Sequence, residues 1–134
     1  MNGNKMRLRF DRVEVRPVAE GQTRVEVTFT FGPRTIVTGT DAGNNRHNIL
    51  RAASTATLEA VQQAAEAKFT CVVEDLDRVN ALGKQLIAVL VNVDFETRQF
   101  QVFGSCQIDD DDVTAAVRAT LNATNRIVDL ATRA

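Results

Sequence analysis

The chain has 134 residues, which is enough for one ordinary domain and too few for two independent ones. Its 16 Lys and Arg balance 17 Asp and Glu, a formal net charge of -1 that argues against a dedicated nucleic-acid binder. Hydrophobic residues at 44% and charged residues at 25% indicate a folded domain. The chain shows neither an apolar run of about 18 residues nor a signal-peptide pattern. We therefore expect a soluble, cytoplasmic protein with no nucleic-acid or membrane partner.

The first third of the chain has the alternating pattern of β-strands. The parity of the hydrophobic positions switches between Phe10 and Val13, which predicts a first strand interrupted by a β-bulge. Strict alternation predicts a second strand over residues 25–31. A short third strand over 35–38 then leads into a polar loop over 39–45.

The pattern changes to helical spacing after this loop. Small and apolar residues recur at that spacing over 49–65, and Asn44 or Asn45 is a suitable N-cap. Strand signals resume at 69–73 and at 86–93. The run over 86–93 is apolar at both parities, which is typical of a central strand covered on both faces.

The second half repeats this order of elements. A further strand ends near Gly104, and Asp109 to Asp112 open a second helix. Within the two helices, residues 52–60 match residues 115–123 at six of nine positions. Gly39 and Gly104 stand at places that we interpret as equivalent, each ending a strand hairpin before its helix.

These observations predict an α+β fold made of a duplicated βββα unit. After a flexible tail over 1–5, a single domain over 6–134 contains two repeats, at about 6–66 and 68–132. Its antiparallel strands carry two helices packed on one side. The sequence leaves open whether the strands form one continuous sheet or two layers.

The second repeat also carries a family resemblance. The stretch Phe103-Gly-Ser-Cys-Gln-Ile-Asp-Asp-Asp-Asp-Val113, small residues at helical spacing after it, and Asn125-Arg126 resemble the C-terminal regulatory domain of α-isopropylmalate synthase. That domain is a duplicated βββα unit of similar length, so the resemblance covers nearly the whole chain. It implies a domain that dimerises, binds an end-product amino acid and passes inhibition to a separate catalytic barrel.

The residues around the start of the first helix are the candidate ligand site. Backbone N–H groups and the positive end of a helix dipole favour a carboxylate or phosphate there. The alternative is structural, with glycines for the turn, an asparagine cap and solvated Arg and His side chains. The candidate ligand-binding residues are Gly39, Asp41, Gly43, Asn44, Asn45, Arg46 and His47.

Two charged stretches have competing interpretations. The aspartates at 109–112 could hold a hard cation, but they lack the alternate spacing and central Gly of a calcium loop, so helix capping is favoured. These aspartates should also repel an anion, which makes the first helix start the better ligand site. The basic residues near the N-terminus suit either a partner contact or a solvated outer sheet face; they are Lys5, Arg7, Arg9, Arg12 and Arg16.

Nothing in the sequence assembles catalytic chemistry. Two cysteines and one histidine are too few for a zinc site built from such ligands, and Cys71 and Cys106 fit buried small side chains better than a disulfide. We expect no cofactor, no metal and no catalytic residues. Because two helices cover only part of the apolar strand surface, we expect a self-associating module, a dimer that could sense a small anionic metabolite. The alternatives are a scaffold that contacts another protein and binds no ligand, and a small enzyme with an interface site.

Overall fold

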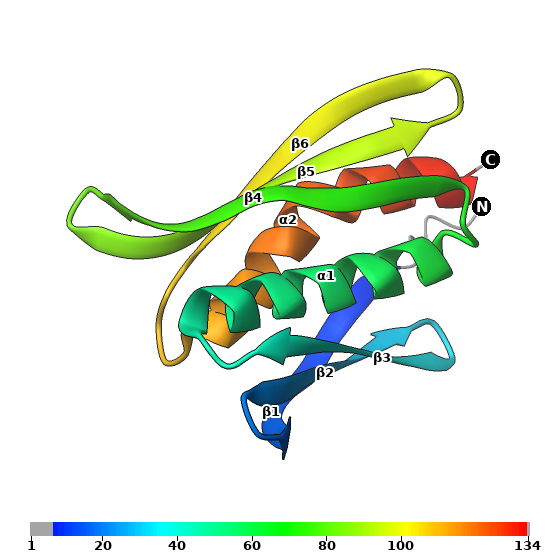
Figure 1. Ribbon diagram of the computed structural model, residues 1–134. Coiled ribbons are helices and arrows are strands. Elements are labelled where there is room, and N and C mark those ends of the chain that lie inside the picture. Colours follow the sequence, from blue (N-terminus) through cyan, green and yellow to red (C-terminus); the bar gives the residue numbers. More distant parts are fainter. Residues whose placement is uncertain (1–6, 134) are drawn as a thin grey trace.

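The protein consists of two βββα repeats that follow each other along the chain. The computed structural model describes residues 7–133, so the predicted tail over 1–5 lies outside the described residues. The duplicated unit is confirmed (Figure 1). The first repeat contains β1 (Leu8–Ala19), β2 (Gln22–Phe31), β3 (Arg34–Gly43) and α1 (Arg46–Ala64), and the second contains β4 (Phe69–Ala81), β5 (Lys84–Phe95), β6 (Arg98–Gln107) and α2 (Asp112–Arg133).

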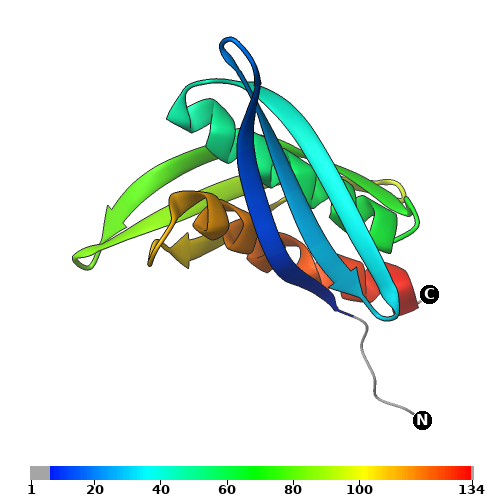
Figure 2. The ribbon, with the colours of Figure 1, turned by 90° about the horizontal axis from the view of Figure 1, so that it is seen from below.

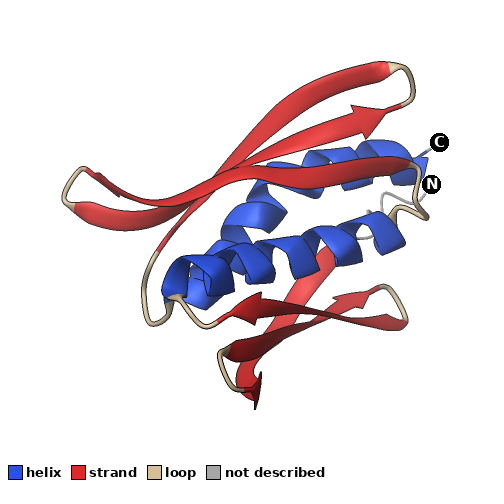
Figure 3. Cartoon of the chain, in the orientation of Figure 1, coloured by secondary structure: helices blue, strands red, loops and turns tan. Residues whose placement is uncertain are grey.

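The strands form two separate antiparallel sheets, with the orders β1-β2-β3 and β4-β5-β6. The two helices lie side by side between the sheets (Figures 1 and 3). Figure 2 shows from below how the first sheet crosses both helices. Each helix packs on its own sheet and also contacts the other one, α1 at β4 and α2 at β1. The question left open by the sequence is thereby answered: the repeats form two layers of strands around a helical layer.

Small side chains let the two helices approach each other. Ala53, Ala56, Ala116 and Ala119 are completely buried, and between the helices the hydroxyls of Ser54 and Thr120 share a buried hydrogen bond of 2.6 Å. Inward-facing residues of both sheets fill the rest of the core, and each fully buried Val or Phe contributes about 1.5–3 kcal/mol relative to exposure. The largest of these strand residues are Phe29, Phe69, Leu76, Ile87, Val25, Val27, Val89, Val91 and Val93.

Two local predictions are confirmed. The register of β1 against β2 shifts between Phe10 and Arg12, which is the bulge indicated by the parity switch. Asn45 is the N-cap of α1, and its side-chain oxygen accepts a hydrogen bond of 2.8 Å from the backbone N–H of Asn48.

Two predicted strands extend further in the structure than the sequence indicates. The expected loop over 39–45 is wrong as far as Gly43, because β3 stays paired with β2 up to the pair Gln22–Gly43. Likewise the strand predicted over 69–73 continues as β4 to Ala81, so Asp75 and Asp77 belong to this strand. Outward polar side chains such as Asp41, Asp75 and Asp77 hid both extensions, because pairing of the backbone does not require outward positions to be apolar.

The predicted equivalence of Gly39 and Gly104 is also wrong. Gly39 lies on the outer face of its sheet, where a Cβ would meet the Arg24 guanidinium at 2.7 Å. Gly104 faces inward, and a Cβ there would lie 2.6 Å from the backbone nitrogen of Ala123 in α2. The two glycines therefore serve opposite faces of their sheets, and only Gly104 permits close packing of a helix on a strand.

Within residues 7–133, neither helix has the length and apolar character needed to cross a membrane.

Candidate functional site

The N-termini of the two helices meet at a cluster of ionic side chains. Arg46, the first residue of α1, donates from Nε to Asp112 Oδ2 at 2.8 Å and from Nη2 to Asp112 Oδ1. Arg78 on β4 donates to the same Oδ2 from its Nη2, also at 2.8 Å. Asp112 is the first residue of α2, so one carboxylate joins both helix starts and a strand of the second sheet.

The electrostatics of this cluster follow from its geometry. The hydrogen bond from Arg46 lowers the pKa of Asp112, and the nearby charges of Arg46 and Arg78 act in the same direction. The bond from Asp112 correspondingly raises the pKa of Arg46. The Asp112 side chain is 8% exposed while both arginines are about half exposed, so the carboxylate is held by two partly hydrated cations. From the sequence, the aspartates at 109–112 are expected to repel an anion near their own helix; in the structure two of them, Asp111 and Asp112, pair with Arg46.

The other candidate ligand residues have structural contacts of their own. Asp41 pairs with Arg24 at 3.0 Å, the Asn44 side chain accepts a hydrogen bond from Thr23 at 3.3 Å, and Asn45 caps α1. Gly43 lies beside the Asn48 side chain, and His47 is exposed.

The seven candidate residues do not line one pocket. Gly39 and Asp41 face outward on β3, whereas Arg46 bonds to α2. None of the seven is among the residues that line the four surface hollows described in the structure. The ligand site at the first helix start stays a prediction.

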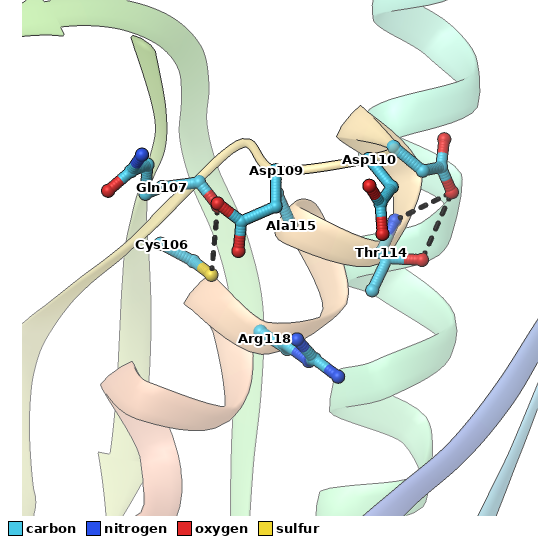
Figure 4. A pocket seen from close by; sticks show the side chains of 8 residues that line it. Cys106, Gln107, Asp109, Asp110, Thr114, Ala115 and Arg118 are labelled. Atoms are coloured by element: carbon cyan, nitrogen blue, oxygen red, sulfur yellow. Dashed lines mark hydrogen bonds between the residues drawn. The ribbon is translucent and has the colours of Figure 1, made fainter. Parts of the chain in front are cut away.

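A small hollow of about 140 Å³ lies beside the N-terminus of α2 (Figure 4). Asp111 caps the helix there, since its carboxylate accepts hydrogen bonds from the backbone N–H and the hydroxyl of Thr114, at 3.2 and 3.0 Å. Helix capping, the interpretation favoured from the sequence, accounts for Asp111. Among the described residues, no group of three or more Asp, Glu, His and Cys side chains could hold a metal ion.

Both cysteines are free thiols. Burial raises the pKa of Cys71 to about 12, and burial also raises the pKa of Cys106, which lines the hollow beside α2. Both thiols therefore stay protonated at neutral pH. Since the thiolate is the nucleophile, neither cysteine is poised for catalysis.

The outer face of the first sheet is covered by charged side chains that pair with each other. Arg16 and Arg24 both contact Glu26, at 3.8 and 4.0 Å, and Arg24 also binds Asp41. Arg9 and Arg12 each contact the acidic residue two positions further along β1. Of the two interpretations of the basic N-terminal stretch, the structure therefore agrees with a solvated outer sheet face whose charges are paired. Lys5 lies outside the described residues.

The outer face of the second sheet is apolar at its centre. Along β5 the outward Leu86, Ala88 and Leu90 are half-buried and alternate with inward residues that are fully buried, and the same outward row continues with Asn92, which hydrogen-bonds to Glu74 and Gln101. Phe103 on β6 is 65% exposed beside Leu90, and Val72 on β4 is 64% exposed. We name this surface the β4–β6 outer face; its outward side chains include Val72, Asp75, Asp77, Val79, Leu86, Ala88, Leu90, Asn92, Gln101, Phe103, Ser105 and Gln107.

This surface was missed from the sequence, although one signal could have located it. The run over 86–93 predicts a strand covered on both faces, whereas the described chain covers only the face toward the helices. The outward Leu86, Ala88 and Leu90 are half-buried within the sheet and carry no covering layer from residues 7–133. Arg78 was also missed, because only the fold brings β4 to the start of α2.

No protein-family model matches the chain, and no curated protein matches it either. The fold and the surfaces described above therefore carry the functional argument.

Proposed function

We propose that the protein is a non-catalytic interaction module that works by self-association, as a homodimer in the cytoplasm. The observation that carries this proposal is the β4–β6 outer face. Phe103 is nearly two-thirds exposed and lies beside Leu90, which shares an outward row with Leu86 and Ala88, whereas the equally exposed Val72 lies further along the face, opposite Asn92. Contiguous apolar side chains on a protein surface mark interaction sites, whereas scattered ones are ordinary.

Other features agree with a module of this kind. The described ionic cluster joins elements of the fold, and the two thiols are held in their unreactive form. The resemblance of the second repeat to the regulatory domain of α-isopropylmalate synthase favours the same type of function, because that domain dimerises.

The oligomeric state of the full chain tests the proposal. Sedimentation velocity over a wide range of protein concentration should show a dimer that dissociates on dilution. A monomer at every concentration would refute self-association and would favour the alternative, a scaffold that contacts a different protein.

Sensing of a small anionic metabolite is a separate part of the proposal and needs its own measurement. Arg46 and Arg78 already hold the Asp112 carboxylate, so an anion that binds there must compete with it. A ligand that binds only the folded state raises the melting temperature by mass action. A panel of amino acids, keto acids and phosphorylated metabolites should raise it with one class, and Arg46→Ala should abolish that shift; an unchanged melting temperature across the panel argues for a module without a ligand.

A further inference from the structure

We infer that the β4–β6 outer face binds an extended basic segment of another protein, with Lys or Arg side chains of that segment in two acidic hollows of the face. This inference goes beyond the proposed self-association, because the occupant is not a second copy. It follows from carboxylates that the chain leaves unpaired, from the composition of the two hollows, and from the distance between them.

The outer faces of the two sheets differ in how their carboxylates are neutralised. On the first sheet, four carboxylates contact arginines of the same sheet at 3.0 to 3.9 Å; they belong to Asp11, Glu14, Glu26 and Asp41. On the β4–β6 outer face, four exposed carboxylates form no ion pair within residues 7–133; they belong to Glu74, Asp75, Asp77 and Asp94. A surface that carries unpaired charge of one sign favours a partner of the opposite sign. The charge of this face therefore selects a basic partner.

The cations nearest to the face do not neutralise it. Lys84, the cation in its described outward rows, lies at the tip of the β4–β5 hairpin, four residues along β5 from the row of Asp77 and hence about 13 Å away. Exposed charges separated by more than about 8 Å are largely screened at physiological ionic strength. Arg78 and Arg98 lie on the inner face of the sheet, where Arg78 holds Asp112 and Arg98 lies over an aromatic ring.

The first hollow has the composition that a basic side chain requires. It has a volume of about 180 Å³ and is lined by Asp75, Asp77, Ala88, Leu90 and the 65% exposed Phe103, among others. A Lys or Arg side chain has an apolar stem and a charged end. Leu90 and Ala88 match the stem, the two carboxylates match the charged end, and the exposed ring of Phe103 attracts a cation as well.

The second hollow offers acceptors of hydrogen bonds. It has a volume of about 530 Å³, and its lining includes Asn92, Asp94, Gln99 and Gln101 but no Lys, Arg or His. Gln101 donates from Nε2 to Asn92 Oδ1 at 2.8 Å, and Asn92 donates to Glu74. These bonds engage the two amide nitrogens, so the Gln101 carbonyl oxygen and the Asp94 carboxylate are left to accept from a ligand. An ammonium or guanidinium group supplies donors only, which matches these acceptors.

The distance between the hollows fits one extended chain. On β5 the first hollow is lined by Ala88 and Leu90 and the second by Asn92 and Asp94, so equivalent points lie four residues apart, or about 13 Å. In an extended segment, residues i and i+4 lie on the same side and are separated by the same distance. A segment along β5 with basic residues at i and i+4 therefore fills both hollows at once.

A synthetic peptide tests this directly. The probe is Arg-Thr-Val-Thr-Arg with acetylated and amidated ends, so that only the two guanidinium groups carry charge. Titrated into the full-length chain and followed by NMR, it should shift backbone amides of β5 and β6, and added salt should weaken it. The same peptide with Glu in place of both Arg residues is the control. Equal binding of the two peptides, or no binding of the basic one, would overturn the inference.

Free arginine amide distinguishes a segment from a single small cation. It fits one hollow at a time, so at matched guanidinium concentration we expect it to bind at least about tenfold more weakly than the peptide. Equal affinity would show that the face takes a small cation and that no spanning segment is needed.

Charge-removing variants locate the binding face. Asp75→Asn combined with Asp77→Asn keeps the size of both side chains, and we expect it to weaken peptide binding about tenfold. The matched control is Glu26→Gln combined with Asp41→Asn, which removes two carboxylates from the first sheet and should change the affinity less than about twofold. Equal losses in the two double variants would mean that net charge attracts the peptide and that the β4–β6 outer face does not bind it.

Sedimentation velocity on the same samples separates this inference from the proposed function. A dimer that dissociates as the peptide binds supports both and shows that the basic segment and the second copy compete for one face. A monomer that binds the peptide overturns self-association and leaves this inference intact. A dimer that does not bind the peptide overturns this inference alone.

Discussion

The two repeats share one backbone plan and differ in what their outer sheet faces expose. Glu26 and Leu90 stand at the same distance before the end of their central strands, and Arg24 and Ala88 are likewise equivalent. On the neighbouring strands, Gly39 corresponds to Phe103 by its place in the register. The first repeat thus has a glycine beneath a paired guanidinium where the second repeat has an exposed aromatic ring. The inward apolar pattern, which packing requires, is shared by the two repeats, whereas their outward positions carry different residue types.

Gly104→Ala should have the largest effect, because it tests the inner face of the second repeat. The new Cβ would meet the backbone of Ala119 and Ala123, which cannot move as freely as the end of a side chain. We expect a loss of about 3 kcal/mol in the free energy of unfolding, measured with denaturant. Gly39→Ala is the control, since its Cβ meets only the flexible end of Arg24; equal losses in the two variants would contradict the assignment of these glycines to opposite faces.

Asp112→Asn tests the link between the two repeats. The change removes a carboxylate that accepts hydrogen bonds from Arg46 and Arg78. We expect the free energy of unfolding to fall by only about 1–2 kcal/mol, because both partly exposed guanidinium groups can be hydrated instead. Asp110→Asn, an exposed neighbour in the same acidic run, is the matched control and should change stability little. Similar losses in both variants would show that the general charge of the run matters and that the specific pairing does not.

The stability difference between the wild type and Asp112→Asn should depend on pH in a defined direction. The pairing with Arg46 and Arg78 lowers the folded-state pKa of Asp112 below its ordinary value of 3.8. The ionised carboxylate therefore contributes fully to the free energy of unfolding above pH 3.8, and this contribution is lost as the pH falls through the lowered pKa. The difference in unfolding free energy between the wild type and Asp112→Asn should therefore be constant near neutrality and shrink in acid. Denaturant titrations at a series of pH values measure it, and a difference that grows in acid would contradict the assignment.

Transferring the apolar outward residues to the first sheet tests whether they are sufficient for association. The triple variant Arg24→Ala, Glu26→Leu and Gly39→Phe places the apolar centre of the second repeat on the first sheet. All three positions face outward, so we expect a change in stability of less than about 1 kcal/mol together with assembly beyond the dimer. Sedimentation velocity detects the larger species. If the variant kept the assembly state of the wild type, apolar outward residues would not be sufficient for association.

The smallest effect is expected at the ion pairs of the first sheet. Glu26→Gln removes contacts of 3.8 and 4.0 Å with Arg16 and Arg24, which are partly exposed, and such pairs contribute about 0–1 kcal/mol. Its effect on the unfolding free energy should decrease further as salt is added. A loss well above 1 kcal/mol at high salt would mean that this face is held by something other than screened charges.

The sequence by itself determined the repeat and most of the element types. Alternation located β2, the parity switch located the bulge in β1, and Asn45 was one of two candidate caps for α1. These features depend on local periodicity and on hydrogen bonds between near neighbours, so a single chain segment contains the information. The ends of β3 and β4 were placed wrongly, since outward strand positions carry polar residues that look like loop residues.

Tertiary structure alone decided what the charged and apolar outward residues contact. Arg46, Arg78 and Asp112 come from three elements that are far apart along the chain, and only the packing of the two repeats brings their side chains within hydrogen-bond distance. The apolar pattern of β5 indicates that both faces of the strand suit burial. It does not indicate that both helices lie between the two sheets. Because those helices cover only the inner faces, the outer face of the second sheet has no covering layer in the described part of the chain, and this is the surface on which the proposed self-association rests.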